Sequence, residues 1–125
     1  MAVTLNHTIV AASDKVASAA FLAEILGLPA PSDLSHFRAV RVGETTLDYA
    51  ESEAPIARRH FAFLVSEAEF DQIFARLRAR DLPYWADPFH RQPGRINRWN
   101  GGRGLYFEDP DGHNLEILTR PDAGA

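Results

Sequence analysis

The sequence contains no cysteine among its 125 residues. This absence excludes disulfide bonds, zinc–thiolate centres and a cysteine nucleophile, and it leaves the redox compartment open. No apolar run approaches the roughly 20 residues that span a bilayer. The first ten residues also lack the basic and apolar regions of a secretory signal. We therefore expect a cytoplasmic protein that does not associate with membranes.

An excess of basic residues is missing as well. Thirteen Lys and Arg residues against 17 Asp and Glu residues give a net charge of -4, so nucleic acid is not an expected partner. Hydrophobic residues make up 46% and charged residues 24% of the chain, which is typical of a folded protein. A chain of this length suits one compact domain that spans residues 1–125.

Residue patterns predict two copies of a strand followed by a helix. Ser13 and Ser66 stand where helix N-caps belong, and Ser66 forms a capping box with Glu69. Gly27 can end the first helix in a left-handed conformation. The expected helices span 14–26 and 67–80, and the expected strands span 5–11, 37–42, 45–50, 60–65, 84–85, 104–108 and 114–119.

The two copies indicate an internal repeat. His7 aligns with His60 at a shift of 53 residues (60 − 7), and Asp48 aligns with Glu116 at a shift of 68 (116 − 48). The second copy therefore carries about 15 extra residues, which we assign to 87–102. Neither copy alone could bury both faces of its sheet. The pattern predicts an α+β fold of two pseudo-symmetric modules, roughly 1–53 and 57–121.

Four polar residues interrupt the apolar strands: His7, Asp48, His60 and Glu116. Side chains alternate between the two faces of a strand, so these four can share one face of a sheet. Two imidazoles with one or two carboxylates make a plausible site for a divalent metal. A lone histidine in a strand is more often structural, but two at equivalent positions of a repeat favour metal binding.

The strings LNHTIV, HFAFLVSEAEF and GLYFEDPDGHNLEIL resemble the three signature segments of the vicinal-oxygen-chelate superfamily, which includes glyoxalases, bleomycin-resistance proteins and extradiol dioxygenases. The resemblance implies two βαβββ modules that form a curved, half-open barrel around one metal ion. His7, His60 and Glu116 are the implied ligands. Asp48 stands where glyoxalase-type members carry a Glu as a further ligand.

The resemblance implies a metal-dependent enzyme that acts on a small oxygen-bearing molecule, with Ni, Zn, Mn, Co or Fe as the ion. With Asp48 as a ligand, a glyoxalase-like lyase or isomerase is favoured. Glu116 is then the predicted catalytic residue, because a displaced carboxylate can act as the base. Without Asp48, the remaining triad permits extradiol ring cleavage. Fosfomycin-modifying relatives carry a Ser-Glu-Gly loop where this chain has 100–103, so that activity ranks low.

A rival of another class is a non-catalytic protein that binds a drug or metabolite. For the enzyme, the basic loop at 87–102 predicts that Arg95 and Arg98 contact an anionic substrate. The alternative is a solvated basic loop. His36, His90 and His113 are expected at the surface. The family resemblance and the exposed sheet edges predict a homodimer.

Overall fold

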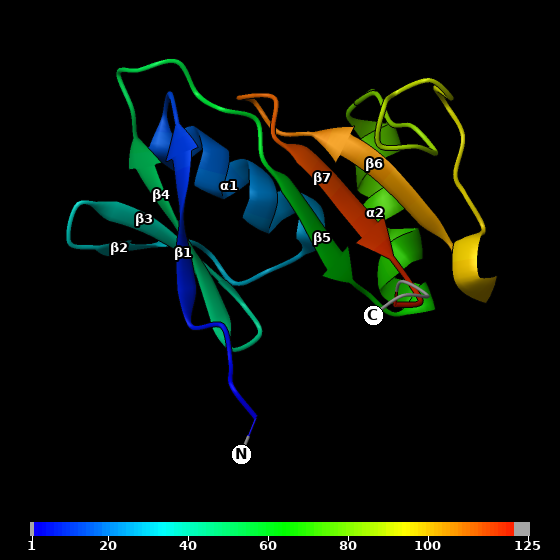
Figure 1. Cartoon of the computed structure of the whole chain (residues 1–125), viewed down its shortest axis with the longest axis horizontal. Coiled ribbons are helices and arrows are strands. Elements are labelled where there is room, and N and C mark those ends of the chain that lie inside the picture. The colour runs from blue at the N-terminus through cyan, green and yellow to red at the C-terminus, as the bar shows by residue number, and fades with distance from the viewer. Residues whose placement is uncertain (1, 122–125) are drawn as a thin grey trace. The chain divides into compact units, whose positions relative to one another are not determined.

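The computed structural model of this chain describes residues 2–121 (Figure 1). These residues belong to two compact units, the first ending at Ala57 and the second beginning at Arg58. None of their helices is long and apolar enough to cross a membrane. The elements are β1 (His7–Ala12), α1 (Lys15–Leu26), β2 (Ser32–Leu34), β3 (Phe37–Val42), β4 (Thr45–Glu51), β5 (His60–Leu64), α2 (Glu67–Ala79), the 3-10 helix η1 (Trp99–Gly101), β6 (Gly104–Glu108) and β7 (Asn114–Leu118).

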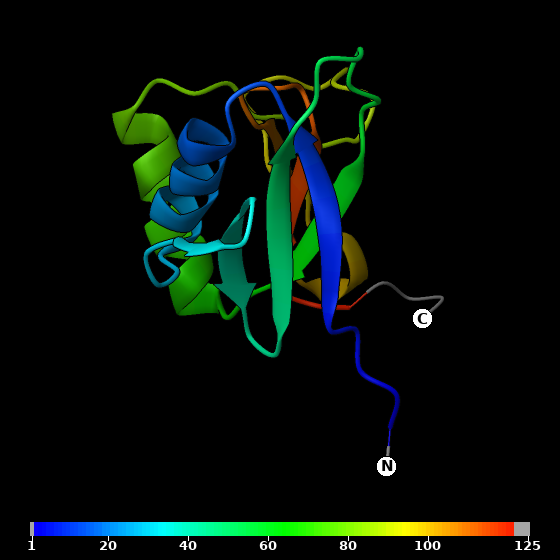
Figure 2. The same cartoon turned by 90° about the vertical axis from the view of Figure 1, so that its left-hand side faces the viewer.

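The first unit is a four-stranded sheet with the strand order β1-β4-β3-β2. Helix α1 lies on one side of β3 and β4 (Figure 2). Asp14 caps this helix, because its carboxylate accepts the amides of Val16 and Ala17, both at 3.1 Å. The cap expected at Ser13 is therefore wrong by one residue, since a carboxylate is also favoured by the helix dipole. Gly27 ends the helix at a φ of 71°, as expected.

The second unit is a three-stranded sheet with the strand order β5-β7-β6, and α2 packs beside it (Figure 1). The capping box is confirmed, because the Glu69 amide donates to the Ser66 hydroxyl at 3.1 Å and the Ser66 amide donates to the Glu69 carboxylate at 2.8 Å. The helix buries Phe70, Ile73 and Leu77. Apolar burial on one helix face thus follows the spacing of the sequence.

Strand pairing confirms the internal repeat. The two parallel strand pairs, β1 with β4 and β5 with β7, have the same register. In each pair, the acid of the second strand lies opposite the residue two positions after the histidine of the first strand. Paired residues point to the same face of a sheet, so each histidine shares a face with the acid of its own unit. The pairs are Ile9 with Asp48 in the first unit and Ala62 with Glu116 in the second.

The insertion of the second unit lies where the repeat predicted it. Trp85 forms a bridge with Tyr106, in the place of the Ser32–Ala39 pair that joins β2 to β3. Trp85 still follows Ser32 by 53 residues (85 − 32), whereas Tyr106 follows Ala39 by 67 (106 − 39). Most of the extra residues therefore lie between Trp85 and Tyr106. The insertion also reduces the strand expected at 84–85 to isolated bridges.

The α+β class and the two-module organisation are confirmed, with one addition. The first unit is a complete βαβββ module, because it contains the short strand β2, which the residue pattern did not predict. The two units divide between Ala57 and Arg58. A single domain and a half-open barrel stay predictions.

Candidate metal centre

His60 and Glu116 approach each other on one face of the second sheet. Nε2 of His60 lies 3.1 Å from Oε1 of Glu116. The parallel register of β5 and β7 brings them together, since His60 pairs with Asn114, two residues before Glu116. The His60 side chain is 48% exposed, whereas that of Glu116 is 7% exposed. An accessible imidazole therefore lies beside a buried carboxylate.

The other ring nitrogen of His60 determines what this contact means. Nδ1 lies 3.1 Å from the carbonyl oxygen of Asn114. A carbonyl oxygen only accepts, so Nδ1 carries the hydrogen, and Nε2 of the neutral ring presents a lone pair to the carboxylate of Glu116. Two such acceptors require a cation or a proton between them. Histidines that bind metals commonly donate their second nitrogen to a carbonyl in this way.

The separation of these two atoms also fits a metal. With ligand bonds of about 2.1 Å, two ligands at a right angle around one ion lie about 3.0 Å apart. The His60–Glu116 contact of 3.1 Å agrees with this value. Imidazole nitrogen with carboxylate oxygen is also a donor set that divalent transition metals accept. The residues present in the second unit therefore fit half of a metal site.

The turn before β7 holds His60 in position. Nδ1 of His113 accepts the amide of Arg59 at 3.1 Å, and the amide of Asn114 donates to the Arg59 carbonyl at 2.8 Å. His113 is only 1% exposed, so the expectation that it faces solvent is wrong. The positive φ of Gly112, 83°, lets the turn direct this imidazole inward.

Asp109 supports the same turn. Its carboxylate accepts the amides of Asp111 and His113, each at 2.9 Å. Burial raises the pKa of Asp109, and the hydrogen bond from the His113 amide offsets this effect only in part. The turn that carries His113 and Asn114 is thus fixed by hydrogen bonds at both ends.

The first unit carries the matching pair, His7 on β1 and Asp48 on β4. Asp48 is 4% exposed, and its Oδ1 has no hydrogen-bond partner within residues 2–121. His7 is exposed, and its Nδ1 lies 2.7 Å from the amide oxygen of Asn6. A buried carboxylate oxygen without a partner is costly. Asp48 therefore also fits a position that receives a cation.

The predicted ligands divide equally between the units, with His7 and Asp48 in the first and His60 and Glu116 in the second. Within the described residues of either unit, no group of three or more histidine or acidic side chains could hold a metal. A complete ligand set that includes His7 stays a prediction of the sequence.

The loop at 87–102 is held by its own hydrogen bonds. The carboxylate of Asp87 accepts the amides of Arg91 at 2.9 Å and Gln92 at 2.8 Å. Burial works to raise the pKa of Asp87, but these hydrogen bonds outweigh it and lower the pKa. Arg95 and Arg98 are exposed on this loop, and their contact with substrate stays a prediction.

Arg103, directly after this loop, and His90 within it have structural contacts. Arg103 binds the carboxylates of Glu67 at 2.8 Å and Asp71 at 2.9 Å, both on α2. His90 stacks on Trp85 with ring centroids 3.7 Å apart. His90 is half-buried rather than at the surface as expected, whereas His36 is exposed, as expected.

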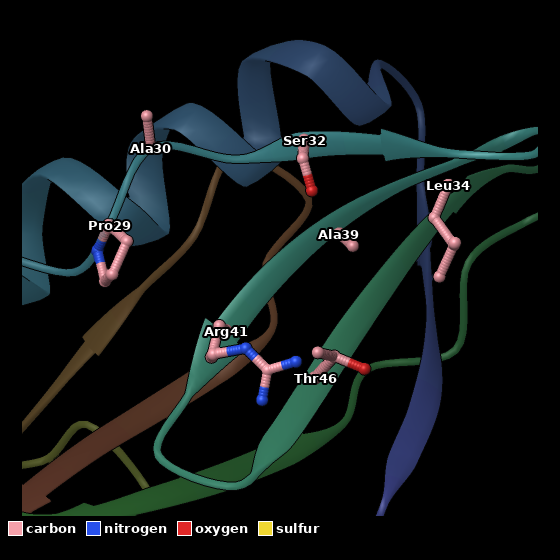
Figure 3. Close-up of a pocket in the computed structure, with 7 residues that line it drawn as sticks. All are labelled: Pro29, Ala30, Ser32, Leu34, Ala39, Arg41 and Thr46. Atoms are coloured by element: carbon pink, nitrogen blue, oxygen red, sulfur yellow. The ribbon is translucent and has the colours of Figure 1, made fainter.

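The sequence patterns missed two pockets. One of about 400 Å³ lies in the second unit and is lined by Arg58, Arg59, His60, Pro88, Phe89 and Asn114. The other, of about 320 Å³, lies in the first unit and is lined by Pro29, Ala30, Ser32, Leu34, Ala39, Arg41 and Thr46 (Figure 3). It shares a sheet face with Asp48, because Asp48 pairs with Ala39. The two arginines directly before His60 were the one sequence signal for the pocket of the second unit.

Two units that each present a histidine and an acid from equivalent strands define the class of protein. The chain belongs to the Glyoxalase/Bleomycin resistance protein/Dioxygenase superfamily, whose family model matches residues 4–117. Among curated proteins, it is 30% identical to glutathione transferase FosA of Serratia marcescens, in a match that covers 91% of this chain and 79% of that protein.

Solved structures include much more similar chains. Oxidase ChaP-H2 is 59% identical, with a TM-score of 0.95 and 98% of both chains covered. Oxidase ChaP-H1 is 57% identical, with a TM-score of 0.94, and the match covers 96% of this chain and 98% of that one. A lactoylglutathione lyase from Agrobacterium tumefaciens, at 22% identity and a TM-score of 0.69 over 92% of both chains, shares the fold.

Proposed function

We propose that this chain is a metal-dependent oxidase that acts on a small organic molecule. The observation that carries the proposal is the identity of 57% and 59%, over almost the whole of each chain, to two proteins named as oxidases. The sequence motifs alone favoured a glyoxalase-like lyase or isomerase and ranked oxidative ring cleavage second. Similarity at this level reverses that order.

In this proposal, His60 and Glu116 bind the metal, and His7 is the third ligand. Two histidines and one carboxylate leave coordination positions open for substrate. A bound divalent ion would supply Lewis acidity and, if it is redox-active, electrons for dioxygen. The Asn114 carbonyl keeps the hydrogen of His60 on Nδ1, which leaves Nε2 free to bind. The carboxylate of Glu116 would hold the ion with the two histidines, and in the glyoxalase-like alternative, where Asp48 is also a ligand, it would accept a proton from substrate.

Tyr106 orients the His60 ring in this scheme. The two rings stack with centroids 5.7 Å apart and an interplanar angle of 26°. Trp99 in turn packs against Tyr106, and the centroids of these two rings are 6.2 Å apart. Tyr106 is buried, so it restricts the imidazole plane and keeps water from one side of it. This packing favours a fixed orientation of the His60 imidazole as a metal ligand.

A glyoxalase-like isomerase is the second candidate, and Asp48 favours it. Its buried Oδ1 lacks a hydrogen-bond partner within the described part of the chain, which suits a fourth metal ligand. A metal held by these four protein ligands would act as a Lewis acid that polarises a substrate carbonyl. The two candidates thus differ in whether Asp48 binds the metal.

The test combines metal analysis with three assays. Protein purified without chelator is analysed for metal, and then tested for oxygen uptake with catechols and hydroquinones, for isomerisation of the methylglyoxal–glutathione hemithioacetal, and for addition of glutathione to an epoxide. We expect about one divalent ion per chain and oxygen uptake, both lost in His60→Ala. The exposed His36→Ala is the matched control and should keep both.

Each contrary result has a defined meaning. Turnover of the hemithioacetal without oxygen uptake would reject the oxidase in favour of the isomerase. Transfer of glutathione to the epoxide would favour the glutathione transferase activity named for the Serratia marcescens relative. Unchanged metal content in both His60→Ala and Glu116→Ala would remove the metal centre itself.

A further inference from the structure

The pocket beside His60 has no role in the scheme above. We call it the Arg58 pocket; its lining residues are Arg58, Arg59, His60, Pro88, Phe89 and Asn114, and its volume is about 400 Å³. Volumes of 300 Å³ upward are typical of small-molecule sites. His60 and Asn114 are strand partners at the start of β5 and β7. The pocket therefore borders the proposed metal ligand directly.

One wall of the Arg58 pocket is an aromatic ring on a rigid support. Phe89 is 76% exposed, although its neighbours are held firmly. The amide nitrogen of the Asn114 side chain donates to the Pro88 carbonyl at 3.2 Å, and the His90 ring lies flat on Trp85. His90 also has a φ of 59°, a strained conformation for a residue other than glycine. Strain and exposure at one loop tip point to ligand contact.

The Arg58 pocket also contains a cation with spare hydrogen-bond donors. Because Asn114 donates through Nδ2 to Pro88, its Oδ1 accepts Nε2–H of His90 at 2.9 Å. Nε2 of His90 therefore cannot accept from Arg58, although the two nitrogens are 3.2 Å apart. Arg58 has Glu108 as its acidic partner, at 3.5 Å. That distance is long for a charge-assisted hydrogen bond.

The Arg58 side chain is 49% exposed, so its guanidinium can still bind an anion from solvent. Guanidinium groups bind carboxylates through two parallel hydrogen bonds. The guanidinium of Arg91 lies 5.5 Å from the Phe89 ring centroid, which adds positive charge close to this aromatic ring. The pocket thus combines a cation with a flat apolar surface next to His60.

We infer that the Arg58 pocket binds the anionic oxygen of a planar aromatic substrate, with the ring of the substrate against Phe89. The inference rests on the proposed function, because it assumes that the reacting part of the substrate lies at the His60 side. Arg58 determines specificity here for a carboxylate or phenolate, and Phe89 for a flat ring. A neutral aromatic molecule lacks the first contact, and an aliphatic acid lacks the second.

The experiment compares two probes of the same shape, 2-naphthoate and the neutral 2-naphthamide, by titration calorimetry with the full-length protein as purified. We expect 2-naphthoate to bind and Arg58→Gln to weaken it tenfold or more, which is about 1.4 kcal/mol. Phe89→Ala should weaken both probes. Arg80→Gln removes the same charge from the exposed C-cap of α2 and should leave both affinities unchanged. Arg58→Lys should recover part of the loss.

Several outcomes would overturn the inference. These are no binding of 2-naphthoate by the wild-type protein, equal affinity in Arg58→Gln, or equally tight binding of 2-naphthamide. A carboxylate that bound only to the metal would bind Arg58→Gln with the wild-type affinity, because this substitution leaves the metal ligands intact. Oxygen uptake is measured separately. Binding that depends on Arg58, without any oxygen uptake, rejects the oxidase and keeps the Arg58 pocket. Oxygen uptake together with binding that does not depend on Arg58 keeps the oxidase and rejects the pocket.

Discussion

Replacing His113 tests whether the turn before β7 positions the proposed metal ligand. His113→Leu removes the acceptor that pairs with the Arg59 amide at 3.1 Å and leaves that part-buried N–H without a partner. Such a loss costs about 1–3 kcal/mol. For 125 residues, an unfolding entropy of about 2.1 cal/mol/K per residue converts each kcal/mol into roughly 4 °C. The melting temperature should therefore fall by about 4–12 °C.

The same substitution should weaken metal binding, because Arg59 directly precedes His60. Loss of a residue that orients a metal ligand commonly lowers affinity about 10–100-fold. His113→Asn restores an acceptor at a similar reach from the backbone, so it should recover metal affinity more than stability, since it leaves a cavity. Chelator competition measures affinity, and circular dichroism measures melting. The exposed His36→Leu is the control.

The two readouts separate the explanations. A lower melting temperature with wild-type metal affinity in His113→Leu would make His113 a purely structural residue. Wild-type values of both quantities would refute the reasoning from the buried hydrogen bond. Equal loss of metal affinity in His113→Leu and His113→Asn would show that ring packing, rather than the acceptor, positions His60.

Four further predictions follow from the described contacts. Asp48→Asn should raise the melting temperature of chelator-treated protein by about 4 °C, because it removes a buried charge that costs about 1 kcal/mol or more; a lower value would mean that the carboxylate has a structural partner. The lowered pKa of Asp87 means that it stabilises its loop above the ordinary value of 3.8 and loses this effect as the pH falls through the lower, folded value. Loop amide shifts in nuclear magnetic resonance should therefore titrate only below pH 3.8, and a midpoint above it would contradict this assignment. Arg95→Ala and Arg98→Ala should each lower kcat/KM about tenfold, or 1.4 kcal/mol, with unchanged metal content; wild-type kinetics in both would make the loop a connector. Light scattering should give twice the chain mass of 13.9 kDa, because β1 and β5 lie at sheet edges, and a monomer at micromolar concentration would refute the dimer.

The sequence by itself determined the elements whose signals are local. The Ser66–Glu69 capping box is formed by side chains three residues apart, so no distant partner is needed to fix it. The glycine at position 27 ends its helix because of its own backbone freedom. The shift between His7 and His60 also predicted which residues occupy equivalent strand positions, since strand alternation is a property of the backbone.

The tertiary structure alone decided where the connecting residues lie. His113 reads as a polar residue after a turn, but its acceptor role depends on Arg59, 54 residues earlier in the chain. Arg58 and Phe89 belong to segments without periodicity and meet only because β5, β7 and the inserted loop pack together. Contacts between distant segments depend on how strands pair and how loops close over them, and no window of neighbouring residues carries that information.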